Sequence, residues 1–326
     1  MRLPMARRLL HTSRSLQHEN PLGLPQKGTI PRFQRGLPQK RPIRGVSHII
    51  AVSSAKGGVG KSTISANLSL AFARLGLRTG LLDTDIFGPS IPTLFDLHGA
   101  APRLSAADQL LPLTNYGVKT MSIGYVLAAA SATGGSVDAG GGGDPSAPVV
   151  WRGPMLLKAV QQLLHHVDWE AAGGADVLVL DLPPGTGDVP LSIAQQVPLD
   201  GAVVVTTPHV LAVRDAVKGV GMLEKVGVPV LGLVQNMSVF VCPCCDAKTE
   251  VFGGGEQVRE MCREKGIEML GDVPLHPNIG DDGSRGKPTV VAEPDSERAQ
   301  VFMDVARKLA GKVGLTLDER AAIKGA

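Results

Sequence analysis

The stretch AKGGVGKST (55–63) has the residue types and spacing of a phosphate-binding loop. Its glycines allow the backbone to turn several N–H groups toward phosphate oxygens, and the N-terminus of a following helix adds a favourable dipole. Lys61 is expected to bind the β- and γ-phosphates, and Ser62 to bind Mg²⁺ through its hydroxyl. Ala55 stands where this pattern usually has its first glycine. The loop residues predicted to bind a nucleotide are Gly57, Gly58, Val59, Gly60, Lys61, Ser62 and Thr63.

Acidic residues at the ends of two predicted strands complete the phosphate site. Asp83 and Asp85 lie in LLDTDIFGPS (81–90), just past the end of a short apolar run. Asp181 ends another such run, VLVLD (177–181), which has the pattern of a Walker B strand. Core strands rarely end in acids for packing reasons. We therefore expect Asp181 to hold Mg²⁺ through water, and the other two acids to orient the attacking water and the water shell of the metal.

Three of the four cysteines lie together in VCPCC (241–245), and the fourth, Cys262, is expected to be a buried helix residue. Cys242 and Cys245 form a C-x-x-C pair, a spacing that suits metal binding or redox chemistry. A closed tetrahedral site needs four ligands, so one pair is half of such a site. The spacing alone leaves zinc and an iron–sulfur cluster open. A redox dithiol is disfavoured, because thioredoxin-type pairs lie at a strand-to-helix turn and this pair leads into Asp, Lys and Thr.

The elements that must position these residues alternate along the chain, which predicts an α/β fold. From Ser47 onward, short β-branched runs alternate with helical patterns, and runs such as VLVLD are apolar throughout. Such runs are typical of strands buried on both faces, so we expect a doubly wound, mainly parallel sheet with helices on both faces. The expected strands are 48–54, 78–83, 177–181, 202–207 and 228–236, and the expected helices are 61–76, 155–167, 213–226 and a C-terminal helix through Phe302, Val305, Ala306, Leu309 and Val313.

Basic residues are concentrated at the N-terminus. Residues 1–45 hold ten Lys or Arg and one acid, Glu19, whereas the remainder holds 23 basic and 29 acidic residues. This Arg-rich, acid-poor leader predicts a mitochondrial presequence followed by a disordered linker, and a protein of the mitochondrial matrix; a disordered basic tail is the alternative. No apolar run reaches the roughly 18–20 residues that span a bilayer. The acidic remainder favours no nucleic-acid partner.

Composition also predicts the other boundaries. We expect a P-loop ATPase domain over 46–314 and a C-terminal tail over 315–326, with the cysteine-containing segment at 237–254. A Gly- and Ala-rich insertion at 127–148 is expected to be disordered, because it cannot bury enough apolar surface to offset its ordering entropy. The C-terminal helix is expected to dock on the core, since its polar face mixes acids and bases.

Lys56, an extra lysine ahead of the loop's glycines, resembles the deviant Walker A motif of MinD/ParA-like ATPases. The resemblance implies that Lys56 reaches across a two-fold interface to the nucleotide of a partner chain. It also implies that Asn236, at the end of a predicted strand, hydrogen-bonds the purine. No Asn-Lys-x-Asp guanine signature occurs there, which favours ATP over GTP. The catalytic residues are then Lys56, Lys61, Asp83 and Asp85, and the nucleotide-binding residues also include Asp181 and Asn236.

Five further segments resemble the Mrp/Nbp group of iron–sulfur scaffold or carrier ATPases. The match runs from Pro42 to Gly314 and, together with the leader, is most similar to mitochondrial members that serve respiratory complex I assembly. The group's C-P-x-C motif implies that Cys242 and Cys245 are cluster ligands and that Cys244 is the variable residue. The segments are WRGPM (151–155), DLPPGTGD (181–188), TTP (206–208), QNMSVFVCPCC (235–245) and VFGGGE (251–256).

The resemblance predicts an ATP- and Mg²⁺-dependent carrier whose homodimer shares one [4Fe–4S] cluster between two cysteine pairs. Such a carrier receives the cluster from donor proteins and delivers it to apo iron–sulfur proteins such as complex I subunits, with slow ATP hydrolysis as a secondary activity. The alternative is a MinD/ParA-like positioning ATPase with a structural zinc site of four cysteines. That alternative needs a basic amphipathic tail or a DNA-binding patch, and the sequence predicts neither.

Overall fold

The computed structural model describes residues 40–132, 153–242, 244–245 and 247–317. The chain divides into residues 1–38, which lie outside the described residues, and Gln39–Ala326, to which every described helix and strand belongs. At the start of the second unit, the Arg41 N–H donates to Gln196 O at 2.7 Å and Ile43 is buried. Residues 40–45, which composition assigns to the linker, thus contact the folded unit, and Ile43 adds apolar surface to its core.

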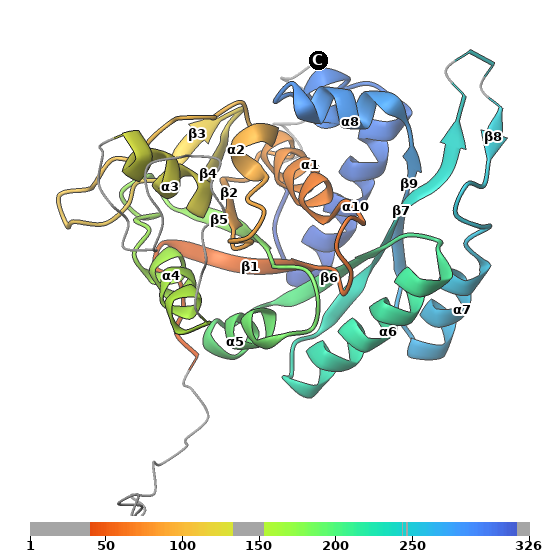
Figure 1. Ribbon diagram of the computed structural model, residues 1–326, viewed down its shortest axis with the longest axis horizontal. Coiled ribbons are helices and arrows are strands. Elements are labelled where there is room, and N and C mark those ends of the chain that lie inside the picture. The colour runs from red at the N-terminus through yellow and green to blue at the C-terminus, as the bar shows by residue number, and fades with distance from the viewer. Residues whose placement is uncertain (1–39, 133–152, 243, 246, 318–326) are drawn as a thin grey trace, which may run out of the picture. The chain divides into compact units, whose positions relative to one another are not determined.

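A nine-stranded sheet lies at the centre of the second unit, within the described residues (Figure 1). Its strands are β1 (Val46–Ser53), β2 (Thr79–Asp83), β3 (Leu113–Asn115), β4 (Val118–Ser122), β5 (Ala175–Asp181), β6 (Gly201–Thr206), β7 (Val230–Val241), β8 (Lys248–Thr249) and β9 (Met269–Leu275). The strand order is β3-β4-β2-β5-β1-β6-β7-β8, with β9 also paired to β7. Only β3 and β8 run antiparallel to their neighbours, so the predicted, mainly parallel sheet is confirmed.

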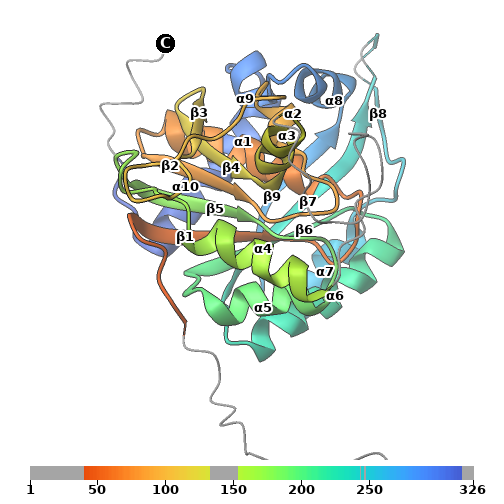
Figure 2. The ribbon, with the colours of Figure 1, turned by 60° about the vertical axis from the view of Figure 1, so that its left-hand side comes forward.

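Helices cover both faces of this sheet, as predicted (Figure 2). On one face α4, α5, α6 and α7 pack in one apolar cluster, and on the other α1, α2, α9 and α10 pack in a second. The helices are α1 (Lys61–Arg74), α2 (Ile91–Leu94), α3 (Ile123–Ala132), α4 (Gly153–His165), α5 (Asp188–Gln196), α6 (Val210–Lys225), α7 (Glu256–Lys265), α8 (Pro277–Ser284), α9 (Thr289–Ala292) and α10 (Glu297–Val313). No helix of the described residues combines the length and apolar character needed to cross a membrane.

Strand β5 shows why its sequence is apolar without alternation. Val177 and Val179 pack in the cluster beneath α1 and α10, whereas Leu178 and Leu180 pack in the cluster beneath α4 to α7. Successive side chains of a strand point to opposite faces, so a strand covered on both sides needs an apolar residue at every position. Burial on both faces therefore explains the run that ends in Asp181.

Two predicted boundaries differ from the structure. The insertion expected from residue 127 begins later, because α3 extends to Ala132 and Leu127 packs against the core; residues 133–148 lie outside the described residues. Strand β7 does not end near Asn236 but continues to Val241, since its last residues pair with β8. At the C-terminus, Leu315 and Leu317 pack on the core, and residues 318–326 lie outside the described part.

Candidate functional site

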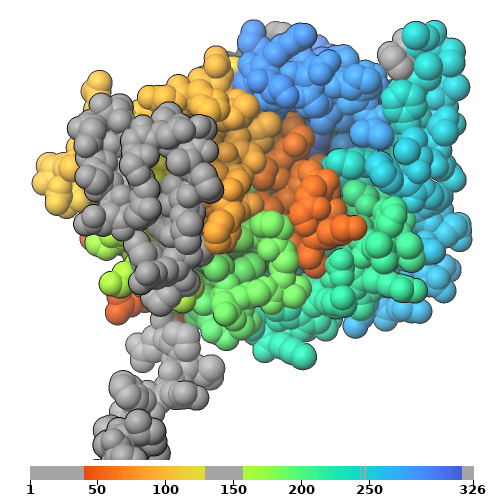
Figure 3. All heavy atoms as spheres, viewed as in Figure 1, coloured from red at the N-terminus to blue at the C-terminus, as the bar shows by residue number. Residues whose placement is uncertain are grey.

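The phosphate-binding loop joins the end of β1 at Ser53 to the start of α1 at Lys61. Gly58 (φ 79°) and Gly60 (φ 85°) have left-handed backbones, which glycine adopts without steric cost. Gly60 is also the N-cap of α1, and its carbonyl accepts a hydrogen bond from the Ile64 N–H at 3.0 Å. In the space-filling view the loop, in orange, lies at the surface in the middle of one face (Figure 3).

A cavity of about 550 Å³ opens beside this loop. Of the predicted nucleotide-binding residues, six line it, whereas Val59 is buried behind the loop. The opposite wall comes from α8, through Ile279, Gly280, Gly283 and Ser284, and from the segment around the start of α2. The six loop residues are Gly57, Gly58, Gly60, Lys61, Ser62 and Thr63.

Asp181 is the centre of a buried polar cluster beneath the loop. Its Oδ1 lies 2.6 Å from Lys61 Nζ and accepts a hydrogen bond from Ser65 Oγ at 2.7 Å, while its Oδ2 accepts one from Ser62 Oγ at 2.6 Å. The Asp181 side chain is 0% exposed and that of Lys61 is 6% exposed, so the two charges compensate each other inside the protein. The Lys61 ammonium thus lies against carboxylate and hydroxyl oxygens, the ligand types that suit Mg²⁺.

Asp83 ends β2 directly opposite Asp181 in the parallel register. Its Oδ1 accepts from the Asp85 N–H at 3.0 Å, and its Oδ2 accepts from Ser122 Oγ at 3.1 Å and the Ser90 N–H at 3.2 Å. Burial, followed by the neighbouring Asp181 carboxylate, raises the pKa of Asp83 to about 7. These bonds shape the segment between β2 and α2, and Asp83 itself does not line the cavity. Asp85 does line it, and burial raises its pKa as well.

A second cavity, of about 420 Å³, adjoins the first because both are lined by Gly60, Thr63, Ile279 and Gly280. Asn236 lies on its wall, where Nδ2 donates to Val59 O at 2.8 Å and Oδ1 makes no hydrogen bond with any described residue. An apolar pocket with one amide acceptor beside a phosphate-binding loop fits a purine base. Its other walls are largely apolar and include Met237, Phe240, Pro274, Leu275 and Pro277.

Lys56 lies at the edge of the loop and is partly buried. It lines neither cavity, and its side chain forms no hydrogen bond or ion pair with a residue that the structure describes. Its role toward the nucleotide of a partner chain stays a prediction.

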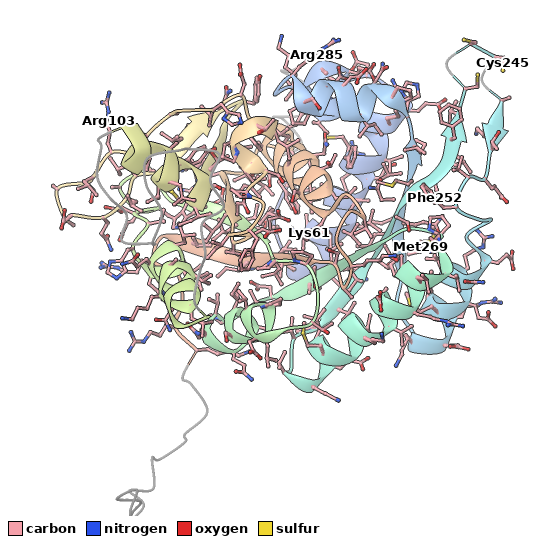
Figure 4. The ribbon with its side chains drawn as sticks, viewed as in Figure 1. Lys61, Arg103, Cys245, Phe252, Met269 and Arg285 are labelled. Carbon is pink, nitrogen blue, oxygen red and sulfur yellow. The ribbon has the colours of Figure 1, made fainter. Side chains whose placement is uncertain are left out.

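The cysteine segment forms the tip of a hairpin between β7 and β8 (Figure 4). Two antiparallel residue pairs and the hydrogen bond from the Cys242 N–H to Ala247 O, at 3.0 Å, close the hairpin. Cys245 lies at its end, well apart from Lys61 (Figure 4). The backbone N–H of Cys244, followed by the Cys245 thiol, lowers the pKa of Cys242, which favours the metal-binding thiolate.

The thiols of this tip are accessible to an outside partner. Cys242 is partly exposed, and Cys244 and Cys245 are exposed, whereas Cys262 is buried in α7, as predicted. Within the described ranges, no group of three or more His, Cys, Asp or Glu side chains could hold a metal ion. The pair Cys242 and Cys245 therefore has the composition of half a four-ligand site.

Sequence reasoning missed several residues of the site. Ser65 donates to Asp181 and lies one helical turn after Ser62, so its spacing on α1 was an available signal. Ser122, which donates to Asp83, is the last residue of an unpredicted strand, β4. No local sequence signal predicts that α8 forms a wall of the cavity, because this helix is distant in sequence from the loop that it faces.

Comparison with known proteins places the chain in a family. The family model described as "ParA: NUBPL iron-transfer P-loop NTPase" matches residues 45–310. The chain belongs to this family. This membership confirms the resemblance inferred from the deviant Walker A loop and the C-P-x-C segment.

Relatives of this NUBPL-type P-loop NTPase occur in animals and plants. The "Iron-sulfur cluster transfer protein NUBPL" of Mus musculus is 45% identical over 279 residues, which cover 85% of this chain and 81% of the mouse protein. The "Iron-sulfur protein required for NADH dehydrogenase, mitochondrial" of Arabidopsis thaliana is 41% identical over 268 residues, which cover 82% of this chain and 79% of the plant protein.

Solved structures share the fold of this NUBPL-type NTPase. The nucleotide-binding protein of Archaeoglobus fulgidus, in complex with ADP, has a TM-score of 0.60 and 33% identity, covering 79% of this chain and 93% of the archaeal chain. The cell division ATPase MinD of Pyrococcus furiosus has a TM-score of 0.55 at 19% identity and covers 81% of this chain and 99% of its own. The MinD likeness supports the predicted MinD/ParA-like fold.

Proposed function

We propose that this protein is an ATP-dependent iron–sulfur cluster carrier of the mitochondrial matrix. Two chains hold one [4Fe–4S] cluster between them and deliver it to apo-proteins, among them subunits of respiratory complex I. The names of the mouse and plant relatives, an iron–sulfur cluster transfer protein and a mitochondrial protein required for NADH dehydrogenase, support this role. The single observation that carries the proposal is the accessible cysteine pair at the tip of the β7–β8 hairpin, in which Cys242 is partly exposed and Cys245 is exposed.

The hairpin suits a cargo that must be received and released. Cys242 and Cys245 offer two thiolates at a tip, and a [4Fe–4S] cluster takes about four. A two-fold axis near the tip brings the same pair from a second chain and completes the ligand set. Because the cluster then lies between exposed tips, separation of the chains opens it to an acceptor or a donor protein.

The nucleotide site fits Mg²⁺–ATP. Ser62 and Asp181 present the hydroxyl and carboxylate oxygens that Mg²⁺ prefers, and the Lys61 ammonium already holds a positive charge against Asp181. When Mg²⁺ is present, Lys61 is free to turn toward the phosphates at the loop. Asp85 then orients a water in the cavity that it lines. Hydrolysis is slow and serves transfer, and Lys56 contacts the nucleotide of the partner chain.

A structural zinc ion is the second candidate for the cysteine pair, since four cysteines suit either metal. In a structural site the metal holds chain segments together. Here the β7–β8 pairing and the hydrogen bond from the Cys242 N–H to Ala247 O close the hairpin through the backbone. This closure favours a transferable cargo over a structural ion.

Anaerobic reconstitution with iron and sulfide tests the proposal. The expected product is brown, contains about four irons and four sulfides per two chains, and has the mass of a dimer. Cys242→Ser and Cys245→Ser should each abolish iron binding, whereas Cys244→Ser and the buried Cys262→Ser should retain it. A full cluster on a monomer, or zinc as the only metal bound, would contradict the proposal. Transfer to an apo iron–sulfur protein is then followed by the acceptor's recovered activity.

A further inference from the structure

Met237 distorts β7 between the nucleotide site and the cysteines. Its φ of 55° lies in the left-handed region, which residues other than glycine seldom adopt. From Asn236 to Phe240, β7 advances four residues while β9 advances only two, from Val273 to Leu275. Extra residues of this kind form a bulge, which bends a strand and redirects the residues that follow. The bulge that contains Met237 therefore sets the direction of the last residues of β7.

The phosphate-binding loop packs directly against this bulge. Asn236 Nδ2 donates to Val59 O at 2.8 Å. A Cβ placed on Gly60 would lie only 2.2 Å from the same Nδ2 and 3.8 Å from the Cε of Met237. Because packed interiors have few voids, a backbone change in the loop displaces the bulge, and a change in the bulge displaces the loop.

The same bulge also borders the second cavity and supports the hairpin. Asn236, Met237 and Phe240 all line that cavity, so a base bound there contacts the distorted part of β7. Phe240 and Val241 then pair with β8, and Cys242 follows at once. Phe240 also pairs with Leu275 of β9, so the bend of the bulge between Asn236 and Phe240 sets the direction in which the hairpin and its thiols extend.

We propose that Met237 is a positioning residue, which transmits occupancy of the nucleotide site to the cysteine hairpin of the same chain. This inference rests on the nucleotide and cysteine roles proposed above, and requires no contact with a second chain. The bound base holds Met237 in its left-handed conformation and so fixes the direction of Cys242. A left-handed backbone is unfavourable for a residue with a Cβ, so Met237 can also adopt an extended conformation, and the base shifts the balance between the two conformations and with it the direction of the hairpin.

Thiol alkylation of the full-length apo-protein tests this coupling. The rate of modification of Cys242 by iodoacetamide is followed by peptide mass spectrometry, without nucleotide, with ADP and with a non-hydrolysable ATP analogue. The key variant is Met237→Gly, because glycine adopts positive and negative φ with similar ease. Met237→Leu keeps a Cβ at the same position. Asp108→Gly is the matched control, since Asp108 also has a positive φ (59°) but lines neither nucleotide cavity.

In the parent chain, nucleotide should change the rate at which iodoacetamide modifies Cys242 by about fivefold. This factor is in line with the free energy that a left-handed backbone costs a residue with a Cβ. Met237→Gly should remove this dependence when each chain is compared with and without a nucleotide concentration that saturates it. Met237→Leu and Asp108→Gly should retain it. The dependence should be the same at two protein concentrations, because an effect of dimerisation would follow mass action.

Three results would overturn the coupling. These are no effect of nucleotide in the parent chain, an unchanged effect in Met237→Gly at saturating nucleotide, or an effect that follows protein concentration, which would assign it to dimerisation. Each of them leaves the carrier proposal standing, because cluster binding is measured separately by reconstitution.

Discussion

The ammonium of Lys61 lies 2.6 Å from Oδ1 of Asp181, in a site where both side chains are almost completely buried. The sequence predicts that the lysine binds phosphates and that the acid holds a metal, yet here each is the partner of the other. A buried charge is costly unless it is compensated. The pairing meets this requirement within the chain itself, and in the proposed function Mg²⁺ and phosphate replace it, so loading the site would exchange one set of partners for another.

Replacing Lys61 should destabilise the nucleotide-free chain as well as abolish nucleotide binding. Lys61→Ala leaves Asp181 buried with only hydroxyl donors, and we expect a loss of about 3 kcal/mol in the free energy of unfolding. Urea unfolding without nucleotide measures it. The matched control is Lys218→Ala, because Lys218 pairs with Asp215 at 2.9 Å on the surface, and an exposed pair contributes less than about 1 kcal/mol. Equal losses in the two variants would contradict the role given to burial.

A methyl group at Gly60 should separate the phosphate-binding loop from β7. Gly60→Ala places a Cβ 2.2 Å from Asn236 Nδ2 at a residue with a φ of 85°, and we expect a loss of roughly 2 kcal/mol in stability and weaker ADP binding. In Gly57→Ala the added Cβ has no atom within 4 Å, and the φ is not positive. Calorimetric titration with ADP and urea unfolding compare the two, and a fully stable Gly60→Ala would contradict the contact.

Asp83 should make folding stability fall as the pH rises toward neutrality. Its folded pKa of about 7 is above the unfolded value, so the native state holds a proton that the unfolded chain has released. The stabilisation is complete below about pH 4 and is lost as the pH rises through about 7, a loss of roughly 2–4 kcal/mol. Asp83→Asn cannot ionise, so its stability should lack this decline. Asp295→Asn, at a side chain that is 93% exposed, should keep it. Parallel stability curves for Asp83→Asn and the parent chain would contradict the expectation.

Cys242 should react with iodoacetamide at lower pH than Cys262 does in the same chain. The N–H of Cys244 lowers the pKa of the first thiol, whereas burial raises the pKa of the second. Peptide mass spectrometry across a pH series gives both profiles at once, because the thiolate is the reacting species. Cys244→Ser retains the backbone N–H and should leave the Cys242 profile nearly unchanged. If the two profiles had the same midpoint, the hairpin would not perturb the pKa of Cys242.

The local sequence pattern was sufficient to predict the parallel sheet and the phosphate-binding loop of this protein. The alternation of apolar runs with helical segments predicted the parallel sheet, and the spacing of AKGGVGKST predicted the loop between β1 and α1. Asp83 and Asp181 were predicted at strand ends, because the chemistry of a phosphate site needs acids at the carboxyl edge of a parallel sheet. The unpredicted strands β4 and β9 have less uniform apolar sequences.

The relations among distant segments needed the tertiary structure. No local signal predicts that Lys61 pairs with Asp181, that α8 forms the far wall of the cavity, or that Met237 adopts a left-handed backbone beside Gly60. Periodicity reports which face of an element is apolar, and motif spacing reports which groups can act together within a few residues. The packing of elements far apart in sequence decides which of those groups meet, and the free energy of that packing is not contained in any single segment.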